Sequence, residues 1–262
     1  MNGKSVLIDL SKCIGCRGCQ VACKQWNQLP GEKTINVGSH QNPQDLSATT
    51  WTLVRFKETE SNGKIDWTFV KDQCRHCLEP PCKAAADDSA PGSAIIDDNG
   101  AVVYSPATSK ITEDLKEMCP YSIPRKDATT GRWAKCTFCH DRIANGLEPA
   151  CVKACPTGAL SFGDRDKILQ TAKERLAQLK NDHPQAKLLD AGDVRWIYLL
   201  HEPEKYFQLG WRQLDRFERY AWRKLFKPQM PLWFATGALA MLFNKRNQRI
   251  RKNKEKQVDE TV

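Results

Sequence analysis

The chain has 262 residues, 27% charged and 40% hydrophobic, which suits one large or two small domains and excludes an intrinsically disordered protein. A mean hydropathy of -0.58 excludes a polytopic membrane protein and leaves room for at most one membrane anchor. The net charge of +9 is concentrated near the C-terminus, since residues 1–210 hold 27 basic and 26 acidic side chains; we therefore expect a membrane surface and no nucleic acid as the basic tail's partner.

The first predicted element is a strand at residues 5–9, which leads into a run of cysteines. Cys13, Cys16, Cys19 and Cys23 follow the spacing CxxCxxCxxxC of bacterial ferredoxins. No secretory signal precedes them, and 12 cysteines are too few for a small disulfide scaffold of this length. The thiols therefore predict a metal site.

Residues 24–135 are predicted to form a second ferredoxin-like unit, inserted into the first. The segment holds short predicted strands at residues 53–56, 67–70, 94–97 and 101–104. Its cysteines are Cys74, Cys77, Cys82 and Cys119, the last followed by Pro120. Ferredoxin spacing places four further ligands where this sequence has Ala86, Ser109, Thr112 and Leu115. None of these is a thiol, so we expect one cluster of a complete double ferredoxin to be absent.

The final cysteine run completes the first unit. It comprises Cys136, Cys139, Cys151 and Cys155, with Pro156 directly after. A strand at 160–162 and an amphipathic helix at 166–181, ending before Pro184, are predicted next.

Cluster ligands follow from a rule of two-cluster ferredoxins, in which the fourth cysteine of each run binds the other cluster. The rule predicts three 4Fe-4S clusters. Their ligands are Cys13, Cys16, Cys19 and Cys155 for the first, Cys136, Cys139, Cys151 and Cys23 for the second, and Cys74, Cys77, Cys82 and Cys119 for the third.

The predicted fold class is α+β, with two ferredoxin-like units and a helical membrane-anchoring tail. The units are residues 1–23 plus 136–165, the insertion 24–135, an extension 166–210 of helix and strand that packs on the core, a basic amphipathic helix 211–227, an apolar anchor helix 228–244 and a basic polar tail 245–262. Residues 230–243 alone are short for a bilayer, so the anchor either spans with help from its flanks or docks on an integral subunit.

Competing interpretations remain for the cysteines. Structural zinc also uses CxxC pairs, although the CxxCxxC triplet and the cysteine-proline endings favour iron and sulfur. Disulfides between cysteines on one tight loop are poorly placed. His76 and His140 adjoin cluster ligands, but we expect them to be packed or solvated rather than ligating.

Four strings carry a family resemblance: CIGCRGCQVACKQWN, DQCRHCLEPPCKA, CPYSIPRK and AKCTFCHDRIANGLEPACVKACPTGALSFGD. Over residues 1 to about 205 they resemble the iron-sulfur beta subunit of membrane or periplasmic formate dehydrogenases, of the three-cluster type. Related subunits serve other molybdenum or tungsten reductases, which stay open as alternatives.

The resemblance implies partners and a location. A separate catalytic subunit with a molybdenum or tungsten bis-pterin centre would oxidise formate, and this chain would pass electrons to a haem-containing membrane subunit or a soluble acceptor. Export with the catalytic subunit would place residues 1–210 on the periplasmic side; the cytoplasmic face is the alternative. Since no dinucleotide fingerprint, phosphate loop or nucleophile elbow occurs, we expect no catalysis by the chain itself.

Overall fold

The computed structural model describes residues 3–61 and 63–206, and its centre is a four-stranded sheet. β1 (Lys4–Asp9) lies between β8 (Leu160–Asp164), which runs antiparallel to it, and β10 (Trp196–Leu200), which runs parallel. β9 (Lys187–Leu189) pairs with the outer side of β10. The strands predicted at 5–9 and 160–162 are thus present, and β9 and β10 lie in the extension 166–210, for which the sequence predicted a strand without its residues.

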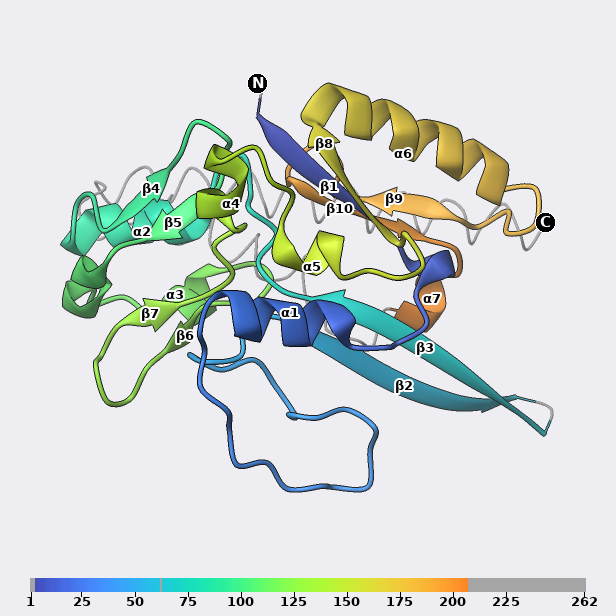
Figure 1. The fold of residues 1–262 in the computed structure, drawn as a ribbon, viewed down its shortest axis with the longest axis horizontal. Coiled ribbons are helices and arrows are strands. Elements are labelled where there is room, and N and C mark those ends of the chain that lie inside the picture. The colour runs from blue at the N-terminus through green and yellow to red at the C-terminus, as the bar shows by residue number, and fades with distance from the viewer. Residues whose placement is uncertain (1–2, 62, 207–262) are drawn as a thin grey trace, which may run out of the picture. The chain divides into compact units, whose positions relative to one another are not determined.

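One face of this sheet is covered by α6 (Arg165–Leu179), close to the helix predicted at 166–181. Leu7, Ile197 and Leu199 point to this face because side chains alternate along a strand. They pack against an apolar row on α6, formed by Ile168, Ala172 and Leu179. The helix is therefore a structural cover for the central sheet (Figure 1).

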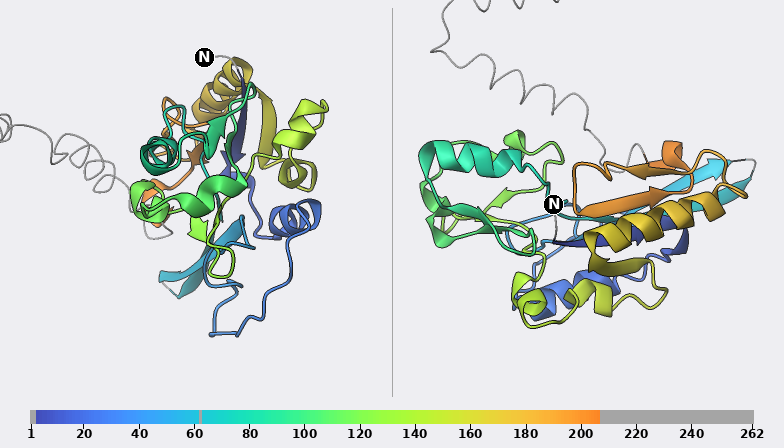
Figure 2. Two further views of the ribbon diagram at one scale, coloured as in Figure 1. Left: turned by 90° about the vertical axis from the view of Figure 1, so that its left-hand side faces the viewer. Right: turned by 90° about the horizontal axis from the view of Figure 1, so that it is seen from above.

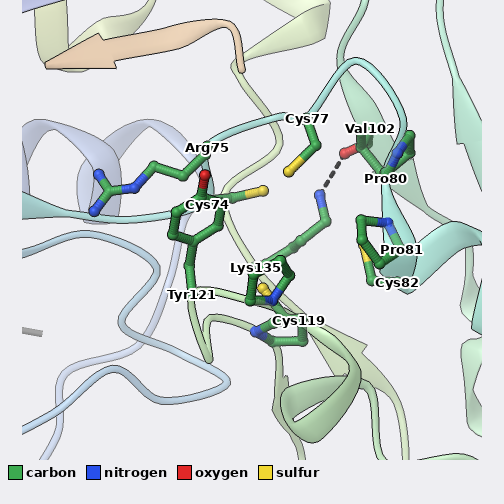
Figure 3. Close-up of a pocket in the computed structure, with 12 residues that line it drawn as sticks. Cys74, Arg75, Cys77, Pro80, Pro81, Cys82, Val102, Cys119, Tyr121 and Lys135 are labelled. Atoms are coloured by element: carbon green, nitrogen blue, oxygen red, sulfur yellow. Dashed lines mark hydrogen bonds between the residues drawn. The ribbon is translucent and has the colours of Figure 1, made fainter. Parts of the chain in front are cut away.

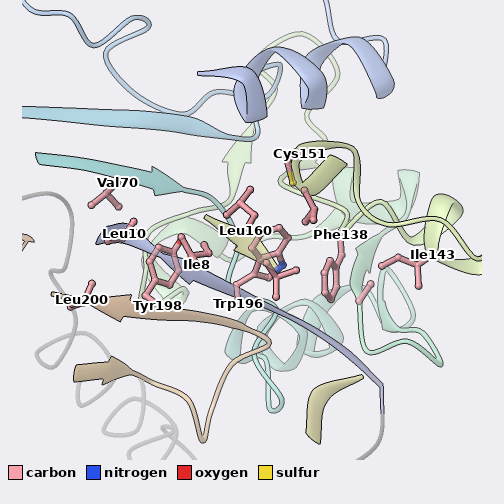
Figure 4. Close-up of a cluster of buried hydrophobic side chains, with 13 residues drawn as sticks. Ile8, Leu10, Val70, Phe138, Ile143, Cys151, Leu160, Trp196, Tyr198 and Leu200 are labelled. Atoms are coloured by element: carbon pink, nitrogen blue, oxygen red, sulfur yellow. The ribbon is translucent and has the colours of Figure 1, made fainter. Parts of the chain in front are cut away.

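The opposite face of the sheet packs against the cysteine-bearing loops. Val6, Ile8, Trp196 and Tyr198 belong to a buried cluster that also contains Phe138 and a cysteine, Cys151 (Figure 4). The rings of Phe138 and Trp196 lie 5.3 Å apart between centroids. This face of the sheet thus supports the loops of the last cysteine run.

Short helices complete this side. The 3-10 turn η1 (Leu10–Lys12) follows β1, and α1 (Gly18–Trp26) carries Cys19 and Cys23. α1 packs against α5 (Ala150–Lys153), which carries Cys151, and the two helices lie side by side in Figures 1 and 2. The remaining helices are α4 (His140–Ala144) and α7 (Pro203–Tyr206). Contact between α1 and α5 brings the first and last cysteine runs together.

A long hairpin precedes the loop that carries Cys74. β2 (Leu53–Ser61) and β3 (Lys64–Asp72) pair antiparallel over their full length. Both strands are longer than the predicted runs at 53–56 and 67–70, because the ladder continues through polar residues such as Lys57 opposite Thr68. β3 leads directly to the loop of Cys74.

Residues 81–134 contain small elements that pack on one another, away from α6 (Figures 1 and 2). They are α2 (Pro81–Ser89), β4 (Ala94–Ile96), β5 (Val102–Tyr104), η2 (Pro106–Lys110), α3 (Leu115–Met118), β6 (Arg125–Lys126) and β7 (Trp133–Ala134). Their shared apolar core contains Ala86, Leu115 and Trp133. The strands predicted at 94–97 and 101–104 correspond to the hairpin of β4 and β5.

The predicted tail elements at 211–227, 228–244 and 245–262 lie outside the described residues. Among the helices of residues 3–206, none is both long and apolar enough to cross a bilayer.

Candidate cluster-binding sites

The first cysteine loop is shaped by two residues with left-handed backbone conformation. Gly15 has φ +65°, and a Cβ there would lie 2.8 Å from the ring of Phe69, so glycine is required. Arg17 has φ +61° and directly precedes α1. The loop presents Cys13 and Cys19 toward the interior and leaves Cys16 exposed. One edge of this site therefore reaches the surface.

Cys155, the last cysteine of the chain, lies with this first loop. Burial raises the pKa of the Cys13 thiol, and the nearby charges of Cys155 and Cys16 raise it further. Burial also raises the pKa of Cys19 to about 12, with added repulsion from Cys151 of the last run and then from Cys13 and Cys16. Cys155 thus lies with the cysteines of the first predicted quartet, and Cys19 also borders the last run.

Cys23 lies instead with the last cysteine run. Burial, followed by the charge of Cys151, raises the pKa of Cys23 to about 11. Burial raises the pKa of Cys139 to about 12, and the charges of Cys151 and Cys23 add to it. Cys136 is affected in the same way, first by burial and then by Cys23. Cys23 thus lies near Cys136, Cys139 and Cys151, the other members of the second predicted quartet.

The third quartet lines one cavity of about 310 Å³, its opening included (Figure 3). Its members are Cys74, Cys77, Cys82 and Cys119. Burial raises the pKa of Cys77 well above its ordinary value, and the charges of Cys119, Cys74 and Cys82 add to the effect. In Figure 3 the sulfur atoms of Cys74 and Cys77 point into the space above Lys135. Tyr104 borders this quartet as well, since the charge of Cys82, after burial, raises the pKa of its hydroxyl.

The donor set fits iron-sulfur clusters. All twelve cysteines are free thiols. Backbone N–H groups of His76 and Phe138 point at Cys74 Sγ and Cys136 Sγ, each at 3.4 Å, because both residues have positive φ and turn the chain around the sulfur. Hydrogen bonds to sulfur are a main determinant of cluster potential.

Geometry also bears on the zinc interpretation. In the part of the chain described, no three His, Cys, Asp or Glu side chains converge on a point that one metal ion could occupy. A 4Fe-4S cluster binds its four thiolates through separate iron atoms, so its ligands are spaced around a volume.

Buried polar atoms without partners lie beside the quartets. The ammonium of Lys71 is fully buried and makes no hydrogen bond, and Gln73, next to Cys74 in sequence, has an unpartnered buried side-chain amide. A buried ammonium is costly unless a negative charge compensates it. Four thiolates around iron and sulfide provide such a charge, so these groups fit an anionic cluster.

Two of the four positions where a fourth cluster would need ligands are buried among apolar groups, and the other two, Ser109 and Thr112, are exposed. Ala86 and Leu115 are fully buried in the core that also contains Ile111 and Trp133. Thr112 N–H donates to Ser89 Oγ at 3.3 Å, and Ser109 Oγ donates to the carbonyl of Pro106. The absence of a fourth cluster stays a prediction.

Neither histidine near the cysteines is brought into a ligand role by the structure. His76 is buried, its Nδ1 accepts a hydrogen bond from Val102 N at 3.0 Å, and its ring lies 5.0 Å from that of Phe138. Burial, reinforced by the charge of Lys135, lowers its pKa well below the ordinary value, so the ring is neutral. His140 begins α4 and is half-buried.

Sequence reasoning missed Lys71 as a site residue. It is three positions before Cys74 but belongs to β3, and a lone lysine in a strand predicts a solvated side chain. No sequence signal marks it, because its burial results from the packing of β3 on β10.

Cysteine loops of this kind, on a mixed α/β scaffold, define a ferredoxin-like protein that holds 4Fe-4S clusters. The profile of the 4Fe-4S dicluster domain accordingly matches residues 65–165. The chain belongs to the family of formate dehydrogenase beta, or iron-sulfur, subunits.

Three relatives show this membership. The formate dehydrogenase beta subunit of Megalodesulfovibrio gigas is 48% identical over 209 residues, which cover 78% of this chain and 97% of that protein. The beta subunit of formate dehydrogenase 2 (cytochrome c-553) of Nitratidesulfovibrio vulgaris is 45% identical over 210 residues, 78% of this chain and 96% of that protein. The iron-sulfur subunit of the nitrate-inducible formate dehydrogenase of Escherichia coli is 38% identical over 245 residues, 91% of this chain and 83% of that protein.

Proposed function

We propose that this chain is the non-catalytic electron-transfer subunit of a formate dehydrogenase complex and that it holds three 4Fe-4S clusters. The observation that carries the proposal is the interleaving of the quartets: Cys155 lies with the first cysteine run, and Cys23 lies with the last. The clusters are bound by Cys13, Cys16, Cys19 and Cys155, by Cys23, Cys136, Cys139 and Cys151, and by Cys74, Cys77, Cys82 and Cys119. The described residues thus form two ferredoxin-like units, the second inserted at 24–135.

A bound 4Fe-4S cluster supplies one-electron transfer at a potential set by its surroundings. The chain supplies the thiolates, excludes water around most of them and donates backbone hydrogen bonds to sulfur. Because each quartet is complete, no iron is left open for a substrate. Formate oxidation is therefore assigned to another subunit.

The quartets lie in an order that suits relay. Cys19 of the first quartet is close enough to Cys151 of the second for their charges to interact. Cys136 of the second interacts in the same way with Cys74 of the third. The second cluster therefore occupies the middle position, and electrons enter and leave through the first and third.

The partners follow from the family. A catalytic subunit with a molybdenum or tungsten bis-pterin centre delivers electrons from formate, and a cytochrome-type acceptor, membrane-bound or soluble, receives them. Residues 211–244 attach the complex to the lipid membrane or to an integral subunit, with the cluster-binding part on the periplasmic side. The match to the Escherichia coli subunit, which includes 91% of this chain, supports a family origin for part of this tail.

Analysis of the anaerobically purified chain tests the cluster count. We expect about twelve irons and about twelve acid-labile sulfides per chain, four of each for each of three clusters. Zinc without sulfide would overturn the proposal, and about sixteen irons would refute the absence of the fourth cluster. Formate-dependent dye reduction by the co-purified complex identifies the partner; reduction driven by another substrate instead would assign the chain to a different molybdenum or tungsten enzyme.

A further inference from the structure

Lys71 occupies an unusual position near the end of β3. Its side chain is among the largest fully buried ones, and its ammonium has no hydrogen-bond partner. The ammonium lies 4.5 Å from the centroid of the Trp196 ring, at the floor formed by β10. The Tyr198 hydroxyl donates to the Lys71 carbonyl at 2.6 Å and fixes the backbone at this point. The charge is therefore held in a defined place.

The Trp196 ring under this ammonium belongs to a buried cluster that contains Cys151 of the second quartet, and Cys13, Cys19 and Cys155 of the first quartet pack against the same cluster. Burial disfavours its charged form, but nearby thiolate charges outweigh burial and raise the pKa of Lys71. These thiolates are Cys151, Cys136 and Cys23 of the second quartet and Cys19 of the first. Lys71 thus lies at the junction between two proposed clusters.

Lys135 provides an informative comparison. It is also buried, but its ammonium donates to the carbonyls of Val102 and Cys136. Both ammonium groups lie over an aromatic ring and near thiols, Lys135 at Tyr104 beside the third quartet and Lys71 at Trp196, but of the two Lys135 alone has backbone carbonyl partners. The negative charge that compensates Lys71 must come from the quartets.

We propose that Lys71 is a positioning residue for charge, which raises the reduction potentials of the first and second clusters and lowers the repulsion between electrons on them. Each reduction adds one negative charge to a cluster that already carries four thiolates. A fixed positive charge in a water-excluded junction stabilises the reduced form more than the oxidised form. This inference rests on the proposed function, because it requires clusters at both quartets.

The test is a redox titration of the anaerobic complex, followed by electron paramagnetic resonance of each cluster. Lys71→Met and Lys71→Gln remove the charge, and Lys71→Arg keeps it. Lys173→Met removes a charge from the exposed side of α6, behind the sheet, and is the matched control. Cys119→Ser assigns the signal of the third cluster.

In both neutral variants we expect the reduced-to-oxidised ratio of the first and second clusters, at a fixed potential, to fall about tenfold. For a one-electron couple this corresponds to a shift of about 59 mV to more negative values. The potential of the third cluster stays at the parent value in both neutral variants. In Lys71→Arg and Lys173→Met the potentials of all three clusters stay at the parent values.

Unchanged potentials in a Lys71→Gln complex with full iron content overturn the inference and leave the proposed function intact. An equal shift of all three clusters overturns it as well. Loss of iron from both neutral variants would give Lys71 a role in assembly and also overturn the inference. Absence of iron and sulfide from the parent chain would instead reject the proposed function.

Discussion

Replacement of Leu115 by alanine tests whether the third cluster depends on the apolar core of residues 81–134. Leu115 is fully buried among Ala86, Ile111 and Trp133 and begins the four-residue helix α3. The Cys119 N–H donates to the Leu115 carbonyl at 3.1 Å, so the two residues share one turn. Because Leu115 is the buried residue of this helix, its loss frees the backbone that presents Cys119.

The expected cost follows from burial. Replacement of a fully buried leucine by alanine lowers the free energy of unfolding by about 2–5 kcal/mol, depending on how far the cavity collapses. Each kcal/mol lowers the melting temperature of a domain of 150–250 residues by about 2–4 °C, so we expect a decrease of about 4–20 °C. The loss is local, since α6 and the central sheet pack around a separate core.

Iron analysis, electron paramagnetic resonance and an anaerobic melting curve measure the outcome. We expect the signal of the third cluster to weaken while those of the first and second stay at parent intensity. Leu147→Ala is the control, because Leu147 is 48% exposed and its truncation should change neither quantity. An even loss of iron from all three clusters, or a parent-like melting curve, would refute this reasoning.

Three further results are expected. Cys119→Ser should remove the third cluster's signal and about four irons, and an effect on the first cluster would contradict the quartets. Asp45→Asn should lower the free energy of unfolding by about 0.2–1 kcal/mol and speed proteolysis in residues 28–50. The reason is that half-exposed Asp45 forms ion pairs with Arg55 at 2.8 Å and with Arg125 at 2.7 Å. Burial raises the Asp45 pKa, but these arginines lower it by more. The stability from this contact is thus present above the ordinary carboxyl pKa and is lost as pH falls through the lowered pKa. The free energies of unfolding of parent and variant should therefore differ at pH 6 and converge below about pH 4. A difference that stays constant with pH would show another cause. Cys16→Ser, at the exposed ligand, should affect the first cluster alone, as measured by the same spectra.

The cysteine grouping could be predicted because it depends on local spacing. A CxxCxxC loop fixes the reach of three thiols, and the exchange of fourth cysteines sends Cys23 and Cys155 to opposite sites. The structure places these thiols close to the predicted neighbours. The ligand assignment itself stays a prediction until iron is measured.

The residues of the central strand β10 and its pairing with β1 could not be predicted in the same way. Trp196–Leu200 is a continuous apolar run buried on both faces, without the alternation that marks a half-exposed strand. Its partner β1 lies near the other end of the chain, so no local signal defines the pairing. Lys71 was missed for a related reason, because its burial results from the same long-range packing.

Pairing of Val6 with Trp196, 190 residues later, has a consequence during synthesis. At about 5–20 residues per second, a ribosome needs about 10–40 s to travel between these partners. Until β8 emerges, late in that interval, the first strand has neither neighbour, and its apolar side chains and hydrogen-bonding edges are open to wrong associations. The four-stranded sheet is therefore completed only after every cysteine of the chain has been synthesised.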